Sequence, residues 1–368
     1  MKTIVAIFSL FLFSNNTYLF SAAGSSNPVP ASSSNRKRLE RSESLPIKAK
    51  KASSVVRSHS ALSSLPTQLN PITATAARQG ARPRMEDTFY NNDKKKLWGV
   101  YDGHGGTRIA LQAKEKLHKL IFEHEKTLTT QQALIQSFAQ FHEEIKSESY
   151  RIGTTATVAL VRSGKLYVAN VGDSRAVLCV NGHAQQVSID HNPDLPSEQT
   201  RIESLGGEVS VIPCGRIFDF LETTESTVKK EYTVARFGNS GLAVSRALGN
   251  VNLGDLLCVK PDIYSRDLNG TEDFLIIASD GLWDVMSNQA AVDLVKHWLN
   301  EGMHPLICAN NLVDKALALW NHDNVTATII FFDPAIITKW TLDSDQTTED
   351  DGYSTEELLS SFSGSDTE

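Results

Sequence analysis

The sequence predicts one domain of mixed helices and strands, spanning residues 71–340, between two polar ends. Residues 24–70 contain 13 Ser and eight Lys or Arg but only two acidic residues, whereas residues 341–368 contain nine Asp or Glu and no basic residue. Neither end has enough apolar side chains to build a core. The 270 residues between the ends suffice for one large core, and in them apolar β-branched runs alternate with helical periodicity.

The predicted strands are short apolar runs flanked by residues that favour turns. Strands are expected at residues 97–101, 157–161, 166–171, 176–180, 274–278 and 325–332. Helices are expected at residues 108–124, 130–149, 289–299 and 305–319, with a short one at 197–205. In the second helix, Leu134, Phe138, Phe141 and Ile145 are spaced i, i+4, i+7 and i+11, so they share one face that packs into the core.

The first 23 residues have the pattern of a signal peptide. Lys2 precedes an apolar run at residues 4–13, and the small residues at 21–23 offer a cleavage site. The alternative is a membrane anchor over residues 4–23, which the polar residues 14–17 in its middle disfavour. We therefore expect a secreted or exported chain that has no stable membrane association after cleavage.

Residues 24–70 are predicted to be a Ser-rich, basic, disordered segment, and residues 341–368 an acidic disordered tail. Short basic clusters at residues 35–41 and 48–51 are typical of nuclear localisation signals, here in a host cell. The alternative is that they are solvated charges that no partner recognises. The residues around Ser44 resemble a docking site for 14-3-3 proteins once that serine is phosphorylated. Together with the signal sequence, these features indicate an exported effector of a bacterium or parasite.

Charge and cysteine content exclude several classes of protein. The formal net charge is -7 for the chain, and the predicted domain is itself acidic, whereas a protein that neutralises the phosphates of nucleic acid would be basic. The four cysteines are widely spaced and include no CxxC pair. They predict neither a disulfide framework nor a zinc site.

Three aspartates lie at the ends of predicted strands. Asp102 and Asp280 each follow a buried run and precede a glycine, and Asp323 comes just before the strand that begins at residue 325. Strand ends of one core converge, and a group of like charges needs a counter-ion. Mg2+ and Mn2+ take carboxylate and carbonyl oxygens as ligands. The alternative is that each Asp-Gly pair is simply a turn.

An arginine and an acidic pair add a second signal. Arg82 lies four residues before Glu86 and five before Asp87. A guanidinium binds phosphate through paired hydrogen bonds, so this segment would place an anion-binding group beside a cation site. The alternative is an ordinary surface ion pair.

Seven motifs in order resemble the metal-dependent protein serine/threonine phosphatases of the type 2C class (PPM-type). They span residues 80–332 and are found at Arg82 to Asp87, Tyr101 to Gly106, Gly153 to Ala156, Val171 to Arg175, Leu242 to Gly249, Ser279 to Val285 and Asp323 to Thr326. The resemblance implies an α+β fold: a four-layer α-β-β-α sandwich with two antiparallel sheets and a binuclear metal cleft. It also implies phosphorylated proteins as substrates.

The same resemblance implies a role for each motif residue. Two Mn2+ or Mg2+ ions, with a possible third and weaker ion, activate a bridging water that attacks phosphorus in line. The implied ligands of the two ions are Glu86, Asp87, Asp102, Gly103, Asp280 and Asp323, and those of the third ion are Asp173 and Asp284. Arg82 would bind the substrate phosphate, and His104 would be the general acid that protonates the leaving oxygen. His104 could instead be a structural turn histidine.

Two departures from the family pattern concern the substrate side of the cleft. Asn250 stands where the family often has Asp, which removes a charge. Residues 190–236 look like the family's flap beside the cleft, but their stretch 221–231 matches nothing in it, so substrate choice does not carry over.

Asn324 begins an Asn-Val-Thr sequon inside a metal motif, so either the chain avoids glycosylation or folding protects this residue.

Three hypotheses of function remain at this stage. The first is an active phosphoserine/phosphothreonine phosphatase, because every expected ligand position is filled. The second is a pseudophosphatase that acts as a binding module, whose mark would be a lost ligand aspartate. The third is another two-metal hydrolase such as a nuclease, which the acidic domain disfavours.

Overall fold

The computed structural model describes residues 70–218, 229–237, 241–319 and 322–346. All of these belong to one of the two compact units into which the chain divides, residues 61–368. The expectations for the signal peptide, for the segment 24–70 with Ser44, for flap residues 221–228 and for the acidic tail from residue 347 lie outside the described residues.

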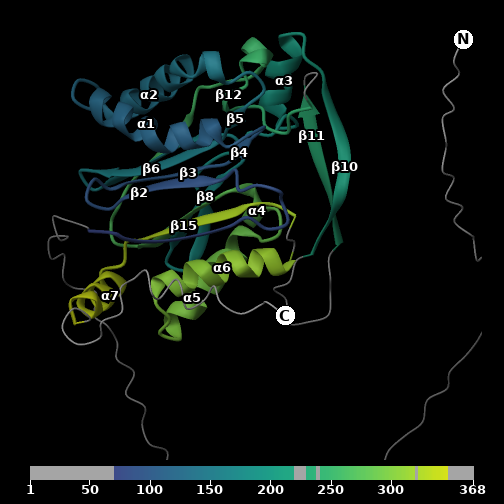
Figure 1. Cartoon of the computed structure of the whole chain (residues 1–368). Coiled ribbons are helices and arrows are strands. Elements are labelled where there is room, and N and C mark those ends of the chain that lie inside the picture. The colour runs from purple at the N-terminus through teal and green to yellow at the C-terminus, as the bar shows by residue number, and fades with distance from the viewer. Residues whose placement is uncertain (1–69, 219–228, 238–240, 320–321, 347–368) are drawn as a thin grey trace, which may run out of the picture. The chain divides into compact units, whose positions relative to one another are not determined.

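Two five-stranded antiparallel sheets form the centre of the fold (Figure 1). The first has the order β1 (Ile72–Arg78), β15 (Val325–Phe331), β14 (Glu272–Ala278), β8 (Arg175–Val180), β9 (His183–Gln186). The second has the order β13 (Asp262–Asp267), β7 (Lys165–Val171), β6 (Ala156–Arg162), β3 (Leu97–Tyr101), β2 (Thr88–Asn92). The antiparallel sheets in a mixed fold confirm the predicted fold class.

The two sheets pack face to face because their central strands bury side chains on both faces. In β3, Trp98 and Val100 belong to the core shared with the first sheet, whereas Leu97 and Tyr101 point to the opposite face. β14 alternates in the same way, with Leu275 and Ile277 in the shared core and Phe274, Ile276 and Ala278 on the other face. This two-residue period is that of a strand, and burial on both faces explains the continuous apolar runs.

Helices cover the outer face of each sheet (Figure 1). α1 (Arg108–His124) and α2 (Thr130–Glu144) pack on the second sheet, and α5 (Asn288–Asn300) and α6 (Pro305–Leu319) pack on the first. Thr129 caps α2 in a reciprocal capping box with Gln132. The helix predicted to continue to residue 149 ends at Glu144, and a 3-10 turn η1 (Lys146–Glu148) follows it.

The remaining elements lie around the sandwich. A small sheet has the order β12 (Leu248–Gly249), β5 (Gly153–Thr154), β4 (Gly103–His104), and β10 (Val209–Phe218) pairs with β11 (Lys229–Phe237). The helices are α3 (Pro196–Ser204), α4 (Asp280–Trp283), α7 (Pro334–Gln346) and the 3-10 helix η2 (Val251–Leu256). The expected domain end at residue 340 falls within α7. In the described part of the chain, no helix has the length and apolar character needed to span a membrane.

Candidate metal centre and active site

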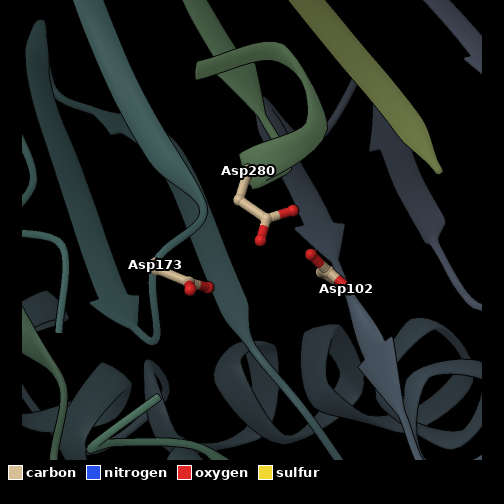
Figure 2. A group of neighbouring side chains, drawn as sticks. All are labelled: Asp102, Asp173 and Asp280. Atoms are coloured by element: carbon tan, nitrogen blue, oxygen red, sulfur yellow. The ribbon is translucent and has the colours of Figure 1, made fainter. Parts of the chain in front are cut away.

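Three aspartates that lie far apart in the sequence meet between the sheets. Asp102, Asp173 and Asp280 each place one carboxylate oxygen within 4.8 Å of the others, and all three side chains are partly exposed. Figure 2 shows them pointing toward one another from a strand end, a loop and the start of a helix. The cluster is therefore accessible to an ion from solvent.

Backbone hydrogen bonds fix Asp102 where β3 ends. Its N–H donates to Thr155 Oγ1 at 3.1 Å, and its carbonyl oxygen accepts from Thr155 N at 2.8 Å and from Thr154 Oγ1 at 3.0 Å. Gly103 follows, and a Cβ there would lie 2.6 Å from the carbonyl oxygen of Glu86. The glycine thus allows the acidic pair Glu86 and Asp87 to approach the end of β3.

Ser279 links Asp280 to Asp87. Its hydroxyl donates to Asp87 Oδ2 at 2.7 Å and accepts from the N–H of Thr326 at 3.0 Å. Asp280 comes next and begins α4. After it, a Cβ on Gly281 would overlap the carbonyl oxygen of Asn324, so only glycine lets these two segments lie so close.

Asp173 lies in the turn between β7 and β8. Gly172 has a φ of +98°, and its carbonyl oxygen accepts from Asn170 Nδ2 at 3.0 Å and from His191 N at 3.0 Å. His191 is fully buried and its Nδ1 also accepts from the N–H of Gly172, at 3.2 Å. Buried side chains therefore hold the turn that presents Asp173 to the cluster.

The electrostatics of the cluster favour its neutral form unless a cation is present. Burial, followed by repulsion from neighbouring carboxylates, raises the pKa of both Asp102 and Asp280 well above the usual range. Burial also raises the pKa of Asp87 to about 6, and burial with repulsion from Asp284 and Asp190 raises that of Asp173 to about 8. Asp323 adds to this repulsion at all four carboxyl groups.

Arg82 lies at the edge of this cluster and pairs with Asp323. Its Nη2 donates to Asp323 Oδ2 at 2.6 Å and its Nε to the carbonyl oxygen of His322 at 2.9 Å. The side chain of Arg82 is 51% exposed and that of Asp323 is 29% exposed. The two predicted roles, phosphate binding and metal binding, therefore fall on side chains in direct contact.

Asn324 joins the Arg82 segment to the metal motifs. Its Nδ2 donates to the carbonyl oxygens of Gln79 at 2.7 Å and Arg84 at 3.0 Å, and its Oδ1 accepts from Glu86 N at 2.7 Å. The residue is 5% exposed. A glycan on this amide is incompatible with these hydrogen bonds, so a chain with this fold carries none at Asn324.

His104 lies in β4, beside the cluster, and bonds to Asn250. The distance between His104 Nε2 and Asn250 Oδ1 is 2.7 Å. Burial lowers the pKa of His104, while this hydrogen bond acts in the opposite direction. Asn250, which removes a charge from the substrate side of the cleft, thus contacts the candidate general acid.

The structure brings most of the predicted site residues together. Asp102, Asp280 and Asp173 form the tight group, Asp87 joins it through Ser279, and Asp323 and Asp284 act on it electrostatically. Glu86 is placed by its backbone, whose carbonyl oxygen accepts from Gly103 N at 3.2 Å. The sequence assigned no role to Ser279, Thr155 or Thr154, although all three lie within the quoted motifs.

The donor set fits a hard divalent cation. Carboxylate oxygens are the ligands that Mg2+ and Mn2+ prefer, and the raised pKa values show a concentration of negative charge that a cation would relieve. The three cysteines whose side chains are described, Cys179, Cys258 and Cys308, are free thiols. Fold and site together define an α+β protein with a candidate divalent-cation site.

Comparison with known proteins agrees with this class. The family model described as Protein phosphatase 2C matches residues 75–325. The chain is 37% identical over 268 residues to "Probable protein phosphatase 2C 69" of Arabidopsis thaliana, covering 70% of this chain and 69% of the relative. It is 37% identical over 266 residues to "Probable protein phosphatase 2C 55" of Oryza sativa subsp. japonica, covering 69% of this chain and 64% of the relative.

The chain therefore belongs to the protein phosphatase 2C family, whose enzymes are metal-dependent protein serine/threonine phosphatases. Among solved structures, it resembles the serine-threonine phosphatase 2C of Toxoplasma gondii with a TM-score of 0.56, over 72% of this chain and 95% of that one. At 22% identity this likeness concerns the fold alone.

Proposed function

We propose that the chain hydrolyses phosphoserine and phosphothreonine in proteins, with two Mn2+ or Mg2+ ions at the carboxylate cluster and a weaker third ion beside it. The observation that supports this proposal is the meeting of Asp102, Asp173 and Asp280 within 4.8 Å in a chain of this family. When bound, the ions supply charge neutralisation and an activated water. No side chain then has to act as the nucleophile.

The residues that would hold the ions come from five segments. They are Glu86, Asp87, Asp102, the carbonyl oxygen of Gly103, Asp280 and Asp323, with Asp173 and Asp284 at the third position. Ser279 supports this assignment because its hydrogen bond orients Asp87, and supporting hydrogen bonds of this kind tune metal ligands.

Arg82 would bind the phosphate of the substrate. Its contacts with His322 and Asp323 occupy two of the five N–H groups that a guanidinium carries. The side chain is 51% exposed, so its other donors are available to a phosphate oxygen above the cluster. Paired hydrogen bonds of this kind orient a phosphate as well as attract it.

His104 would protonate the oxygen of the departing serine or threonine. An alkoxide is a poor leaving group, so a proton donor beside it lowers the barrier and raises the rate, typically by a factor of about 10² to 10⁴. Burial lowers the pKa of His104, which makes its imidazolium a stronger acid. The alternative role, a structural turn histidine, predicts no dependence on the leaving group.

The test is phosphate release from a phosphothreonine peptide by the full-length chain with Mn2+. We expect turnover that EDTA or Asp280→Asn abolishes and that the control Asp267→Asn retains, because Asp267 is 83% exposed at the end of β13. Mn2+ binding by calorimetry without turnover would contradict the proposal and favour the binding module. Hydrolysis of single-stranded nucleic acid instead of the peptide would favour the nuclease.

We also propose that the chain is exported after cleavage near residue 23 and that phosphorylated Ser44 docks 14-3-3 proteins. Both proposals rest on the sequence of residues 1–70 alone. Expression with a carboxyl-terminal tag should yield a secreted chain whose mature terminus lies near residue 24. An intracellular chain that retains residue 1 would contradict export.

A further inference from the structure

A three-stranded sheet places Asn250 against the candidate general acid. In the order β12, β5, β4, Gly153 of β5 pairs with His104 on one side and with Gly249 on the other. Asn250 follows Gly249, and its Oδ1 lies 2.7 Å from His104 Nε2. The two residues are 146 positions apart in the sequence, so only this sheet brings them together.

Gly153 leaves the space in which the two side chains meet. A Cβ on Gly153 would overlap Asn250 Oδ1 and would lie 2.6 Å from His104 Nε2. Both side chains therefore cross the same face of this glycine. No other residue type would allow the contact.

The backbone at Asn250 is shaped for this contact. Asn250 has a φ of +50° and a ψ of 42°, a left-handed conformation that Asn tolerates better than most residues. Its N–H donates to the carbonyl oxygen of Ile152 at 2.9 Å, and the residue is 4% exposed. Although Asn250 occupies the N-cap position of η2, its side chain makes no capping hydrogen bond there. An amide that commonly caps a helix is directed to His104 instead.

The chemistry of the pair sets the roles of the two ring nitrogens. An amide oxygen can only accept, so Nε2 of His104 must carry the hydrogen of this bond. Nδ1 is then the nitrogen that can pass a proton to a substrate. Because the amide oxygen can accept from Nε2–H in both the neutral and the charged imidazole, although more strongly from the charged ring, the ring keeps one orientation throughout a proton transfer.

We propose, on the basis of the phosphatase activity proposed above, that Asn250 is a positioning residue that fixes the orientation and tautomer of His104. As the bond between phosphorus and the serine or threonine oxygen breaks, that oxygen keeps the electron pair and takes the proton from Nδ1. The ring is left neutral, with its Nε2–H still donated to Asn250. A proton from the attacking water restores the charged ring.

The test compares two substrates that differ in leaving group. A phosphothreonine peptide needs a proton donor, whereas p-nitrophenyl phosphate releases a phenolate that leaves without one. Asn250→Gly removes the acceptor and accommodates the positive φ, and Asn250→Asp keeps an oxygen that can only accept. The assays use the full-length chain with Mn2+.

We expect Asn250→Gly to lower kcat on the peptide by roughly tenfold or more and on p-nitrophenyl phosphate by about threefold at most. Asn250→Asp should recover most of the peptide activity. In the background of His104→Gln, Asn250→Gly should cause no further loss, because two residues that act through one another are not additive.

Equal losses on the two substrates, or additive losses in the double variant, would overturn the inference. Loss of peptide activity in Asn250→Asp would overturn it too, and this variant keeps the side-chain shape if Asn250→Gly fails to fold. A parent chain that is inactive on both substrates would instead contradict the proposed function. If His104→Gln lowers kcat equally on the peptide and on p-nitrophenyl phosphate, His104 is not the general acid, and this inference is contradicted as well.

Discussion

Two groups of acidic side chains in this molecule have opposite electrostatics. At the candidate metal centre, burial and mutual repulsion raise the pKa of Asp102, Asp173 and Asp280. Around α3, burial alone would raise the pKa of Glu198, but hydrogen bonds from Arg246 and Arg201 lower it below the usual range. The first group has one arginine at its edge, Arg82, which is paired with Asp323, whereas arginines bind the carboxylates of the second group directly.

The α3 group is a complete ion network. Glu198 is 2% exposed, and it accepts from Arg246 Nη2 at 2.8 Å and from Arg201 Nη2 at 2.9 Å. Arg246 also donates to Asp262 at 2.9 Å, and Asp262 contacts the buried His191 at 3.1 Å. The network connects α3 to the sheets, and within it each carboxylate is paired with at least one arginine.

This difference in electrostatics distinguishes a structural ion network, at α3, from a candidate binding site, at the metal centre. Buried charges are paired in native proteins because an unpaired one is costly. Where several carboxylates converge and arginines do not neutralise all of them, a bound cation must supply the remaining positive charge. The arrangement at Asp102 is therefore explained by binding, whereas that at Glu198 is explained by folding.

The largest expected effect comes from removing a ligand carboxylate. Asp102→Asn should lower phosphatase activity by roughly 10³-fold or more, about 4 kcal/mol of barrier, because charge at the cluster organises the ions. Glu198→Gln should retain most activity under conditions where it is folded. Steady-state assays on the phosphothreonine peptide measure both variants, and a stronger loss in Glu198→Gln would reverse the comparison.

The next effect concerns stability. Glu198→Gln should lower the free energy of unfolding by about 2 to 3 kcal/mol, because Arg201 loses its carboxylate partner and Arg246 loses one of its two. This value is at the low end for breaking a buried ion pair, because the side chains of Arg201 and Arg246 remain 24% and 14% exposed. Asp280→Asn should leave the metal-free chain at least as stable as the parent at pH 8, since it removes repulsion. Urea unfolding in EDTA measures both, and equal destabilisation would contradict the account.

The pH dependence of stability should have opposite signs in the two groups. In the folded chain the pKa of Asp87 is about 6 and that of Asp173 is about 8, both above the usual range for an aspartate. Between pH 4 and pH 8 these two carboxyl groups therefore bind more protons in the folded chain than in the unfolded chain, and their contribution to the stability of the metal-free protein falls as pH rises through these values. Glu198 and Asp262, whose pKa values are lowered, contribute stability that is lost as pH falls into the acid range.

Thermal unfolding in EDTA at pH 5 and pH 8 tests this sign. The parent chain should lose more stability over this range than Asp173→Asn, and Mg2+ should raise Tm more at pH 8 than at pH 5. If the parent and Asp173→Asn have the same pH dependence, the assignment of raised pKa values to the cluster is wrong.

The smallest effect is expected from a supporting hydroxyl. Ser279→Ala removes the donor to Asp87 Oδ2 and the acceptor for Thr326 N. Apparent Mn2+ affinity should fall by roughly tenfold, the low end for such supporting contacts. Ser137→Ala is the matched control, because Ser137 is equally buried but bonds to Ala133 and His124, away from the cluster. An equal effect in the control would contradict a specific role.

The sequence predicted the centre of each sheet but missed all four edges. The six predicted strands correspond to β3, β6, β7, β8, β14 and β15, which lie inside the sheets. In these two five-stranded sheets, the strands missed are β1, β2, β9 and β13, each at a sheet edge. An edge strand such as β9 (HAQQ) is mostly exposed and polar, so its residues show no continuous apolar run.

The site was predicted unevenly for a similar reason. Asp102 and Asp280 follow long buried strands, so their convergence could be inferred from the strand ends. The contact between His104 and Asn250 depends on β4, β5 and β12, which are two residues long each. Strands so short leave no periodicity in the sequence, and Asn250 was therefore seen only as a missing charge.

The most direct test of the account is Mn2+ binding by the metal-free, full-length chain, followed by electron paramagnetic resonance at pH 7.5. We predict that the parent and Asp267→Asn bind Mn2+ alike, and that Asp102→Asn and Asp280→Asn lose most of the bound ion. Unchanged Mn2+ binding in both Asp102→Asn and Asp280→Asn would contradict the claim that this cluster is the cation site.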